Sequence, residues 1–521
     1  MSTIKFSPFG GVRGGHYFKT AWRSLWKNKF YSAINISGLA VGLATGIMLL
    51  LWVQNELSFD KFNEDYKNIY NLSTHFNANG SERTWDGVPG PLAIYAKSIP
   101  GVKSLVRIAS DFDQNLSNKD KTKIFDGNVV AAVDSGFFSM FNFNLLEGNK
   151  QTLFPNINSV VITQSIAKRL FDNEEALGKV VVYNKELFTV TGVLQVFPEN
   201  SSIRYDAILP MAYNAKQFTE SGGNGDWKTI DEDLGDFAFN TFVQLNNGAD
   251  PQKTGQAFSA AYKKARNGDS DASFQLQNLG DIHLVTADGN NSSLRMVQIF
   301  MLVVILLLAI ASINYINLST ARSLIRAKEV SIRKMVGAQK LQLFFQFIVE
   351  TFLLFCFSAI LAIVLILLLT PLYNSITGKS LSVSISDIAV WKAAAIAVTG
   401  TLIASSIYPA ILLSSFKPLE ALKGKITSGI GIASLRKALV VFQFSISVIL
   451  LVCTIIMSNQ MKFIKNKDIG YDKSYVFSVP LTGELSGHID AVKAELKKYP
   501  GILNVSVIDA YNFSSVGGET G

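Results

Sequence analysis

The sequence predicts an α-helical multi-pass membrane protein with five spans and one large α+β domain outside the membrane. Its apolar residues gather in long uninterrupted runs instead of recurring at the spacing of a soluble core. Five runs reach the roughly 20 apolar residues that are needed to cross a bilayer core. These runs cover residues 32–54, 297–318, 343–370, 389–412 and 438–457.

The first run is predicted to remain as a membrane anchor. It follows 31 polar and basic residues, is longer than the apolar part of a signal peptide, and leads into VQNELSF without a small-residue cleavage site.

Lys and Arg alternate between the segments that separate the spans. Residues 1–31, 319–342 and 413–437 together hold 17 basic and 2 acidic residues, whereas residues 55–296 hold 22 basic and 29 acidic ones. Because basic segments stay in the cytoplasm, this bias predicts a cytoplasmic N-terminus and an extracytoplasmic domain over 55–296. The net charge of +8 is then mostly this bias. It indicates contact with lipid head groups and argues against nucleic-acid binding.

The region between the first two spans reads as a mixed α+β domain. Ser159 to Ile162 is typical of a strand, and Thr163 can cap the helix that SIAKRLF forms after it. The runs KVVVY and ELFTVTGVLQVF are rich in β-branched and aromatic residues, which indicates two more strands. The Gly-rich, acidic stretch 221–236 is expected to be an exposed loop.

The residues after the fifth span resemble the beginning of a second outer domain. Residues 458–521 carry two strand-like runs, SYVFSVP and ILNVSVI, but about sixty residues are few for an independent core. Since the chain repeats the order of basic segment, span and outer domain, we expect a two-repeat protein that is truncated at its C-terminal end.

The sequence offers little material for catalysis. Its two cysteines, Cys356 and Cys453, lie inside predicted spans, and its four histidines are scattered without metal-ligand spacing. The stretch TGKS at Thr377 to Ser380 imitates a phosphate-binding loop, but Tyr373 replaces its first glycine. We therefore expect no enzyme activity and no cofactor bound by this chain alone.

A long motif runs from the end of the second predicted span to the start of the third. Residues 314–350 read NYINLSTARSLIRAKEVSIRKMVGAQKLQLFFQFIVE, which resembles the cytoplasmic loop of the FtsX-like permease domain of ABC transporters. The pattern N-x-x-N-L, then R-x-x-E-(I/V)-x-(I/V)-R-K-x-x-G-A, then F-x-x-E is met without a gap. The matching residues are Asn314, Asn317, Leu318, Arg326, Glu329, Val330, Ile332, Arg333, Lys334, Gly337, Ala338, Phe347 and Glu350.

Other segments resemble the same family. DSGFFSMFNFNLLEGN and the strand-rich stretch from Ser159 to Pro210 are similar to a MacB-like periplasmic core, and SIYPAILLSSFKPLEALKG is similar to the end of the permease domain. An FtsX-like permease domain is accordingly expected over 297–412, with a cytoplasmic linker over 413–437.

The resemblance implies a permease of the MacB, FtsX and LolC type in a bacterial cytoplasmic membrane. Such a permease pairs with a separate cytoplasmic ATPase, which binds ATP and Mg²⁺, and acts as a homodimer or with a second repeat. A periplasmic adaptor, an outer-membrane factor or an envelope hydrolase are further partners that the family implies.

The basic segment after the second span is expected to form a short amphipathic helix at the membrane surface. Glu329 can pair there with Arg326 and Arg333. One interpretation is an ATPase-coupling element, and the other is a surface helix that only enforces orientation. The resemblance favours coupling, by Arg326, Lys328, Glu329, Ile332, Arg333, Lys334, Gly337 and Ala338.

Several residues within the spans also deserve a functional hypothesis. Glu350 is costly in a membrane unless it is paired, and Asn314 and Asn317 lie at a similar depth, which favours an interhelical polar clamp over a proton relay. The stripe of Gly38, Gly42 and Gly46 permits close helix packing, either in a permease dimer or within one chain. Pro409 can kink the fourth span as a hinge or simply mark its exit.

Two further classes of function remain as alternatives to an ATP-driven exporter or mechanotransmission permease. One is an FtsX-like scaffold that regulates a cell-envelope hydrolase without transport. The other is a transmembrane sensor, which the absence of a cytoplasmic output domain disfavours.

Overall fold

The computed structural model describes residues 14–78, 81–377, 388–415, 430–467, 475–477 and 483–507. The chain divides into two compact units. A helical unit contains Met1–Asn55 and Arg295–Gly470, and an α+β unit contains Glu56–Leu294 and Tyr471–Gly521.

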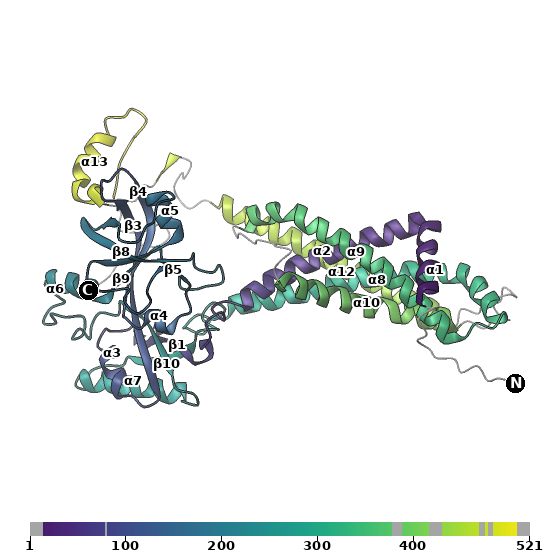
Figure 1. Cartoon of the computed structure of the whole chain (residues 1–521), viewed down its shortest axis with the longest axis horizontal. Helices are drawn as coiled ribbons and strands as arrows, with labels where there is room; N and C mark the ends of the chain where they lie inside the picture. The colour runs from purple at the N-terminus through teal and green to yellow at the C-terminus, as the bar shows by residue number, and fades with distance from the viewer. Residues whose placement is uncertain are drawn as a thin grey trace. The chain divides into compact units, whose positions relative to one another are not determined.

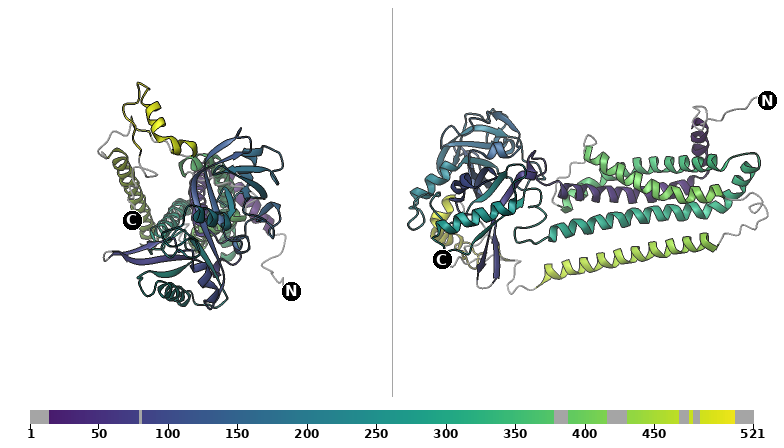
Figure 2. Two further views of the ribbon diagram at one scale, coloured as in Figure 1. Left: turned by 90° about the vertical axis from the view of Figure 1, so that its left-hand side faces the viewer. Right: turned by 90° about the horizontal axis from the view of Figure 1, so that it is seen from below.

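The helical unit consists of long helices that run beside one another, with one shorter helix across them (Figures 1 and 2). Within the described residues, five of these helices are long and apolar enough to cross a membrane, which agrees with the predicted number of spans. The helices of this unit are α1 (Gly14–Lys27), α2 (Lys29–Leu57), α8 (Ser292–Met335), α9 (Lys340–Thr377), α10 (Ile388–Ser415) and α12 (Ile430–Asn466).

Some helices extend well beyond the apolar runs from which we predicted them. Because the third apolar run ends at residue 370 and the fourth begins at residue 389, we expected an outer loop to begin at Pro371, but α9 continues through this residue to Thr377. The prediction was wrong because a proline in a long helix removes a single backbone donor, and in a membrane helix the neighbouring groups can compensate for that loss. The rest of the expected loop, 378–387, and the linker stretch 416–429 lie outside the described residues.

Small side chains allow three of the spans to pack closely. Ala40 and Ala44 of α2, Ala362 of α9 and Ala397 of α10 belong to one buried cluster together with larger aliphatic residues. Packing of this kind is typical of membrane helices, where association depends on close van der Waals contact. By contrast, only 6% of the apolar window of α12 is buried.

The α+β unit is built on an 11-stranded sheet with short helices on it. Its strands are β1 (Ile69–Ala78), β2 (Ser81–Trp85), β3 (Val102–Asn118), β4 (Ile124–Val133), β5 (Leu145–Gly148), β6 (Ser159–Thr163), β7 (Val180–Tyr183), β8 (Glu186–Leu194), β9 (Ala207–Pro210), β10 (Asn240–Leu245) and β11 (Ser273–Asn278). Its helices are η1 (Tyr66–Asn68), α3 (Leu92–Tyr95), η2 (Ala96–Ser98), α4 (Phe137–Met140), α5 (Gln164–Phe171), α6 (Met211–Glu220), α7 (Pro251–Ala265), η4 (Gly483–His488) and α13 (Ile489–Leu496).

Part of this sheet closes into a small barrel. The strand order β3-β4-β9-β6-β8 is continuous, and β7 pairs with both β8 and β3. The pairs β4–β9 and β6–β8 are parallel, and the other pairs of the ring are antiparallel. Closure leaves these strands with few free edges.

Side chains alternate between two cores along the barrel strands, as the period of two requires. Val130 and Ala132 of β4 join a cluster that draws on all the barrel strands, whereas Ala131 and Val133 join a second cluster. Phe137 and Phe141, in and directly after α4, fill this second cluster, which also takes in Phe242 of β10. The second cluster therefore joins the barrel to the remainder of the sheet.

The rest of the sheet follows the order β11-β1-β10-β3 and carries α7. Phe258 and Tyr262 of α7 are buried against Phe274 of β11 and Val243 of β10. Asp250 caps α7, since its side chain accepts from the backbone N–H groups of the first turn, and Pro251 occupies the first helical position.

The local predictions for the α+β unit mostly agree with the structure. The succession β6, α5, β7 and β8 confirms the expected strand, helix, strand, strand unit, and 221–236 is an irregular loop. Thr163 occupies the N-cap of α5, but its hydroxyl pairs with Ser165 Oγ and makes no cap hydrogen bond, so that detail was wrong.

The strand-like run ILNVSVI does not form a strand in residues 502–507. A lone extended segment needs a partner strand to complete its hydrogen bonds. The run SYVFSVP falls largely outside the described residues.

Candidate functional site: the turn between α8 and α9

The segment with the long motif is the continuation of a membrane span. We expected a separate short helix at the membrane surface, but α8 runs without interruption from Ser292 to Met335. The stretch after the apolar run contains no Gly or Pro before Gly337, so nothing in it ends the helix.

Gly337 ends α8 in a compact turn. Its φ of 101° lies in the region that favours glycine. The Gly337 N–H donates to Lys334 O at 3.0 Å, and the Ala338 N–H donates to Arg333 O at 2.9 Å. These two bonds define a Schellman motif. The next helix begins at once, because the Gln342 side chain accepts from the Gln339 N–H at 3.1 Å.

Arg333 braces the turn from within. Its guanidinium donates to Glu329 Oε1 at 2.6 Å, one turn back on α8, and to Gln346 Oε1 at 2.8 Å on α9. The expected pair of Glu329 and Arg333 is therefore present. The side chains of Arg326 and Lys328 lie outside the described part of the chain. Burial, together with the charge of Lys340, lowers the pKa of Lys334.

A small apolar core anchors the turn to α10. Val330, Leu343, Phe347 and Ala410 form one buried cluster. Ala410 follows Pro409, the proline that we considered as a hinge, and α10 continues through both residues to Ser415. The turn, the start of α9 and the end of α10 therefore form one packed body.

Apolar side chains project outward from the same turn. Val336 is 85% exposed and Ile332 is 52% exposed, and they lie beside the charged pair of Glu329 and Arg333. The other large exposed apolar residues of the turn are Met335, Leu341 and Phe345. A rigid turn with an apolar centre and charged neighbours has the composition of a protein-binding surface.

The buried carboxylate of Glu350 has a partner that the sequence did not indicate. Glu350 Oε1 accepts a hydrogen bond from Ser24 Oγ of α1 at 2.9 Å. The expected clamp with Asn314 and Asn317 stays a prediction. Asn314 lies against Gly38, and Asn317 Oδ1 is buried without a hydrogen-bond partner in the described part of the chain.

The glycine stripe of α2 packs inside the chain. A Cβ atom added at Gly42 would lie 2.7 Å from Ala311 Cβ, and one added at Gly46 would lie 2.8 Å from Leu308 Cδ2. With Gly38 against Asn314, the stripe faces one side of α8 over two turns. Of the two alternatives that we weighed for the stripe, this structure has packing within one chain.

Two domain families match the chain, one over the α+β unit and one over the helices that carry the α8–α9 turn. The MacB-like periplasmic core domain matches residues 32–261, and the FtsX-like permease C-terminal domain matches residues 299–418, which include the whole α8–α9 turn. The chain is an ABC transporter permease of the MacB/FtsX type. It is a multi-pass membrane protein with a periplasmic domain, and both matched domains are permease domains.

Among its relatives, this MacB/FtsX-type permease is 24% identical over 438 residues to the ABC transporter permease YvrN of Bacillus subtilis, covering 78% of this chain and 99% of YvrN. It is 22% identical over 414 residues to the macrolide export ATP-binding/permease protein MacB of Neisseria meningitidis. That match covers 78% of this chain but only 60% of MacB.

Solved structures of periplasmic regions are also similar to part of the permease. The periplasmic region of MacB from Actinobacillus actinomycetemcomitans is 20% identical, with 43% of this chain and 95% of that chain covered and a TM-score of 0.30. A domain of a permease protein from Porphyromonas gingivalis is 19% identical, with 42% and 91% covered and a TM-score of 0.35.

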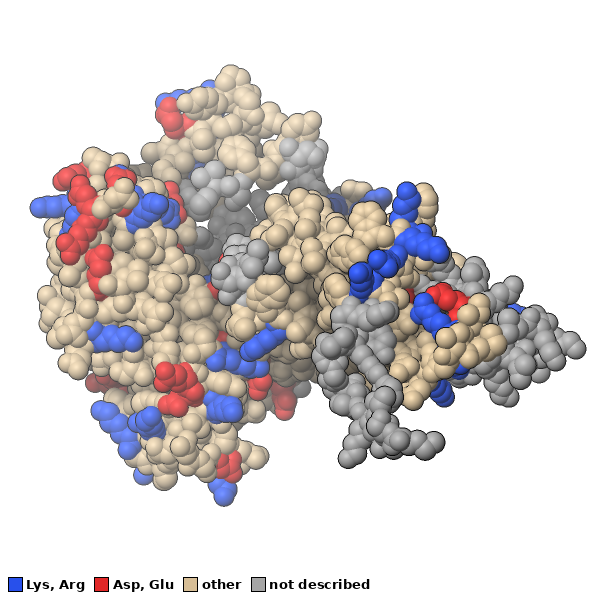
Figure 3. All heavy atoms as spheres, turned by 45° about the vertical axis from the view of Figure 1, so that its right-hand side comes forward, with Lys and Arg blue, Asp and Glu red and all other residues tan. Residues whose placement is uncertain are grey.

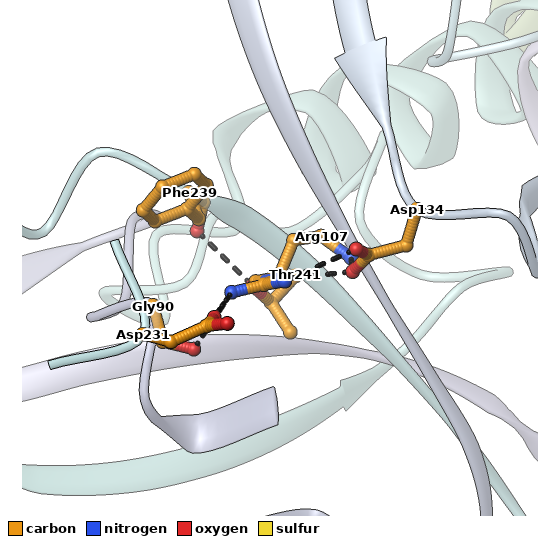
Figure 4. A network of polar contacts seen from close by, with 6 residues as sticks. All are labelled: Gly90, Arg107, Asp134, Asp231, Phe239 and Thr241. Carbon is orange, nitrogen blue, oxygen red and sulfur yellow. Dashed lines mark hydrogen bonds and ion pairs between the residues drawn. The ribbon is translucent and has the colours of Figure 1, made fainter. Parts of the chain in front are cut away.

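The periplasmic domain of this permease contains a buried ionic network that sequence reasoning missed (Figure 4). Arg107 of β3 donates through Nε and Nη2 to the two carboxylate oxygens of Asp134, at 3.1 Å each. Its Nη1 donates to Asp231 at 2.6 Å and to Gly90 O at 3.2 Å. Phe239 lies 5.6 Å from the guanidinium carbon. The network fixes the acidic loop to the sheet, and no motif announces it.

A second polar group lies where the chain leaves α2. His283 Nε2 is 2.7 Å from Glu56 Oε2, and its ring stacks on Phe59. Asp60 is fully buried and accepts from the Ser202 N–H at 2.9 Å. Within the described residues, no group of three or more His, Cys, Asp or Glu side chains could hold a metal ion.

Proposed function

We propose that this chain is the permease subunit of an ABC exporter or mechanotransmission complex. In this proposal a separate cytoplasmic ATPase hydrolyses ATP, and the permease converts that cycle into a conformational change of its periplasmic domain. The two matched permease domains support this function, and the exposed turn between α8 and α9 is the observation that carries it.

The turn would be the contact with the ATPase. Val336 and Ile332 present apolar surface, and Glu329 and Arg333 surround it with charge. Because the Schellman motif and the bond from Arg333 to Gln346 hold α8 and α9 together, a push on the turn moves both helices as one body. The cluster with Ala410 extends the same movement to α10.

A charge placed in the apolar centre tests this assignment. In a complex purified with its ATPase, Val336→Asp should lower stimulated ATP hydrolysis and co-purification by tenfold or more, because desolvating one carboxylate costs more than about 1.4 kcal/mol. Val196→Asp serves as the control, since Val196 is 53% exposed in the periplasmic domain. Intact co-purification and hydrolysis in Val336→Asp would remove the turn from the ATPase contact.

Substrate export distinguishes this proposal from a scaffold that only regulates an envelope hydrolase. The matched MacB proteins are named for macrolide export, which is why export is part of this proposal. This chain spans 60% of the length of those MacB proteins. Reconstituted with its ATPase, an exporter should show hydrolysis that a transported compound stimulates. A scaffold would instead retain a periplasmic hydrolase in a pull-down with the full chain, and its ATP hydrolysis would respond to that enzyme alone.

A further inference from the structure

The short helix α1 has three distinct faces. Ala21 and Leu25 are buried in a cluster with Leu353 and Leu354 of α9. Ser24, on the same side, donates to Glu350. One face of α1 thus packs on α9 through apolar contacts and the partly buried hydrogen bond from Ser24 to Glu350.

The other two faces of α1 are exposed, except that the Trp22 ring lies 5.7 Å from the Phe357 ring of α9. Aromatic side chains recur every four residues, and the last of them continues the row into α2: Phe18, Trp22, Trp26 and Phe30, which are 51%, 41%, 70% and 79% exposed. Basic side chains lie one position after the first three of these rings. They are Lys19, Arg23 and Lys27, all exposed and without an ion pair to any described residue.

The orientation of α1 suits a membrane surface. Figures 1 and 2 show α1 running across the long axis of the helix bundle, so it lies in the plane of the bilayer if the bundle spans it. Figure 3 shows that the visible charge of the bundle is mostly basic and gathers toward one end.

The bond from Ser24 to Glu350 also places α1 along the bundle. After Glu350, α9 carries no charged residue up to its end at Thr377. The uncharged stretch from Thr351 to Thr377 spans about 40 Å at 1.5 Å per residue, which is more than enough to cross a hydrocarbon core of about 30 Å. Glu350 and its partner Ser24 therefore lie near one end of the apolar part of α9.

We propose that α1 is an interfacial helix that binds anionic lipid head groups, and that the bond from Ser24 to Glu350 links this lipid contact to α9. Rings on one face and cations beside them match the two layers of a membrane interface, with the rings at the acyl boundary and the cations at the phosphates. An acidic protein surface could pair with the cations, but it would not explain the exposed rings of Phe18, Trp26 and Phe30 beside them.

The link gives the lipid contact a route to the candidate ATPase site. Glu350 lies in the same helix as Leu343 and Gln346, which pack against and brace the turn at Gly337. Lipid that holds α1 in place would therefore also restrain the first turns of α9. An effect of this restraint on ATP hydrolysis rests on the proposed function, whereas the lipid contact itself does not.

Hydrogen exchange of the full chain in nanodiscs tests the lipid contact directly. Amides of residues 14–27 should exchange about tenfold more slowly in discs with one part phosphatidylglycerol to three parts phosphatidylcholine than in pure phosphatidylcholine, since each basic residue near an anionic surface adds to binding. High salt should reduce the difference. The triple variant Lys19→Gln, Arg23→Gln and Lys27→Gln should lose it.

A matched control separates this effect from a general change in charge. Replacing Lys263, Lys264 and Arg266 of the α+β unit by Gln removes the same two lysines and one arginine, and it should leave the lipid effect on residues 14–27 unchanged. Equal exchange in both kinds of disc, or a lipid effect that survives in the α1 triple variant, would overturn the proposal. So would protection that appears only when an ATPase is added and that ignores the lipid.

The link to α9 needs its own variant. Ser24→Ala should keep the lipid-dependent protection of residues 14–27 but abolish any lipid-dependent protection of residues 340–350. If both segments still responded together, the bond from Ser24 to Glu350 would not be the link. All these readouts are independent of ATP hydrolysis, so they can fail or succeed whether or not the chain drives an exporter.

Discussion

At the scale of single residues, the guanidinium of Arg107 shows how a buried charge ties an outer loop to a sheet. Burial alone would lower the pKa of Arg107, but the hydrogen bonds and charges of Asp134 and Asp231 outweigh it and raise the pKa. Arg107→Ala leaves Asp134 beside a desolvated gap, and we expect it to destabilise the periplasmic domain by about 3 kcal/mol. Hydrogen exchange of β3 and β4 in the full chain measures this loss.

Asp231 provides the comparison for that prediction, because its side chain is 49% exposed. Asp231→Ala should cost at most about 1 kcal/mol, since water can replace the carboxylate as a partner of Arg107. If the two substitutions destabilised the domain equally, the stability of the domain would depend on the bond from Arg107 to Asp231 of the loop and not on the buried pair of Arg107 with Asp134.

A second residue-scale prediction concerns pH. Burial raises the pKa of Asp60 above its ordinary value, and the hydrogen bonds from Ser202 offset only part of this effect. A carboxyl whose pKa is higher in the folded state favours folding most below its unfolded pKa of 3.8 and loses that contribution as the pH rises through the folded value.

Asp60→Asn should remove this pH dependence. Asparagine tolerates the φ of 58° at this position and retains an acceptor for the Ser202 N–H. The difference in melting temperature between wild type and variant should therefore grow in favour of the variant from pH 4 to pH 7. A constant difference over that range would mean that Asp60 does not titrate with the raised pKa.

At the scale of elements, the conformation of Gly337 makes a prediction about the candidate ATPase contact. A Cβ atom at Gly337 would meet no other atom within 4 Å, so Gly337→Ala changes only the backbone energy. At a φ of 101° that cost is about 1 to 2 kcal/mol, and exchange of amides 333–342 should accelerate about tenfold. Gly400→Ala is the matched control. It lies inside α10, has open space around it, and should be neutral or stabilising.

The crossing of α2 and α8 leads to a second prediction about elements. Gly42→Ala brings two Cβ atoms to 2.7 Å, and neither atom can move without its backbone. Gly46→Ala meets only side-chain atoms of Leu308, which can move by rotation of that side chain. We expect Gly42→Ala to destabilise the helical unit by about 1 to 3 kcal/mol in detergent and Gly46→Ala to cost less. Ala311→Gly in the Gly42→Ala background should restore stability. Failure of that rescue would show that the clash lies elsewhere.

For the whole molecule, the sequence predicts what is encoded locally and misses what joins distant segments. A span is announced by one apolar run, and the unit from β6 to β8 is announced by consecutive residues. The closure of the barrel depends on β7 meeting both β3 and β8, and no local pattern specifies that pairing. Ser24 and Glu350 are 326 positions apart, so the sequence shows the cost of the carboxylate but not its partner.

Topology is the remaining prediction for the whole molecule, because the basic bias assigns sides that a structure without a membrane does not. Cysteines can be introduced singly at exposed Asp269, Val336 and Ala494, after Cys356 and Cys453 are replaced by serine. In intact spheroplasts an impermeant maleimide should label positions 269 and 494 but not 336, which should react only after lysis. Five crossings with a cytoplasmic N-terminus produce this pattern. If position 494 were protected together with 336, α12 would not cross the membrane, and the low burial of its apolar surface would then require a cover other than lipid.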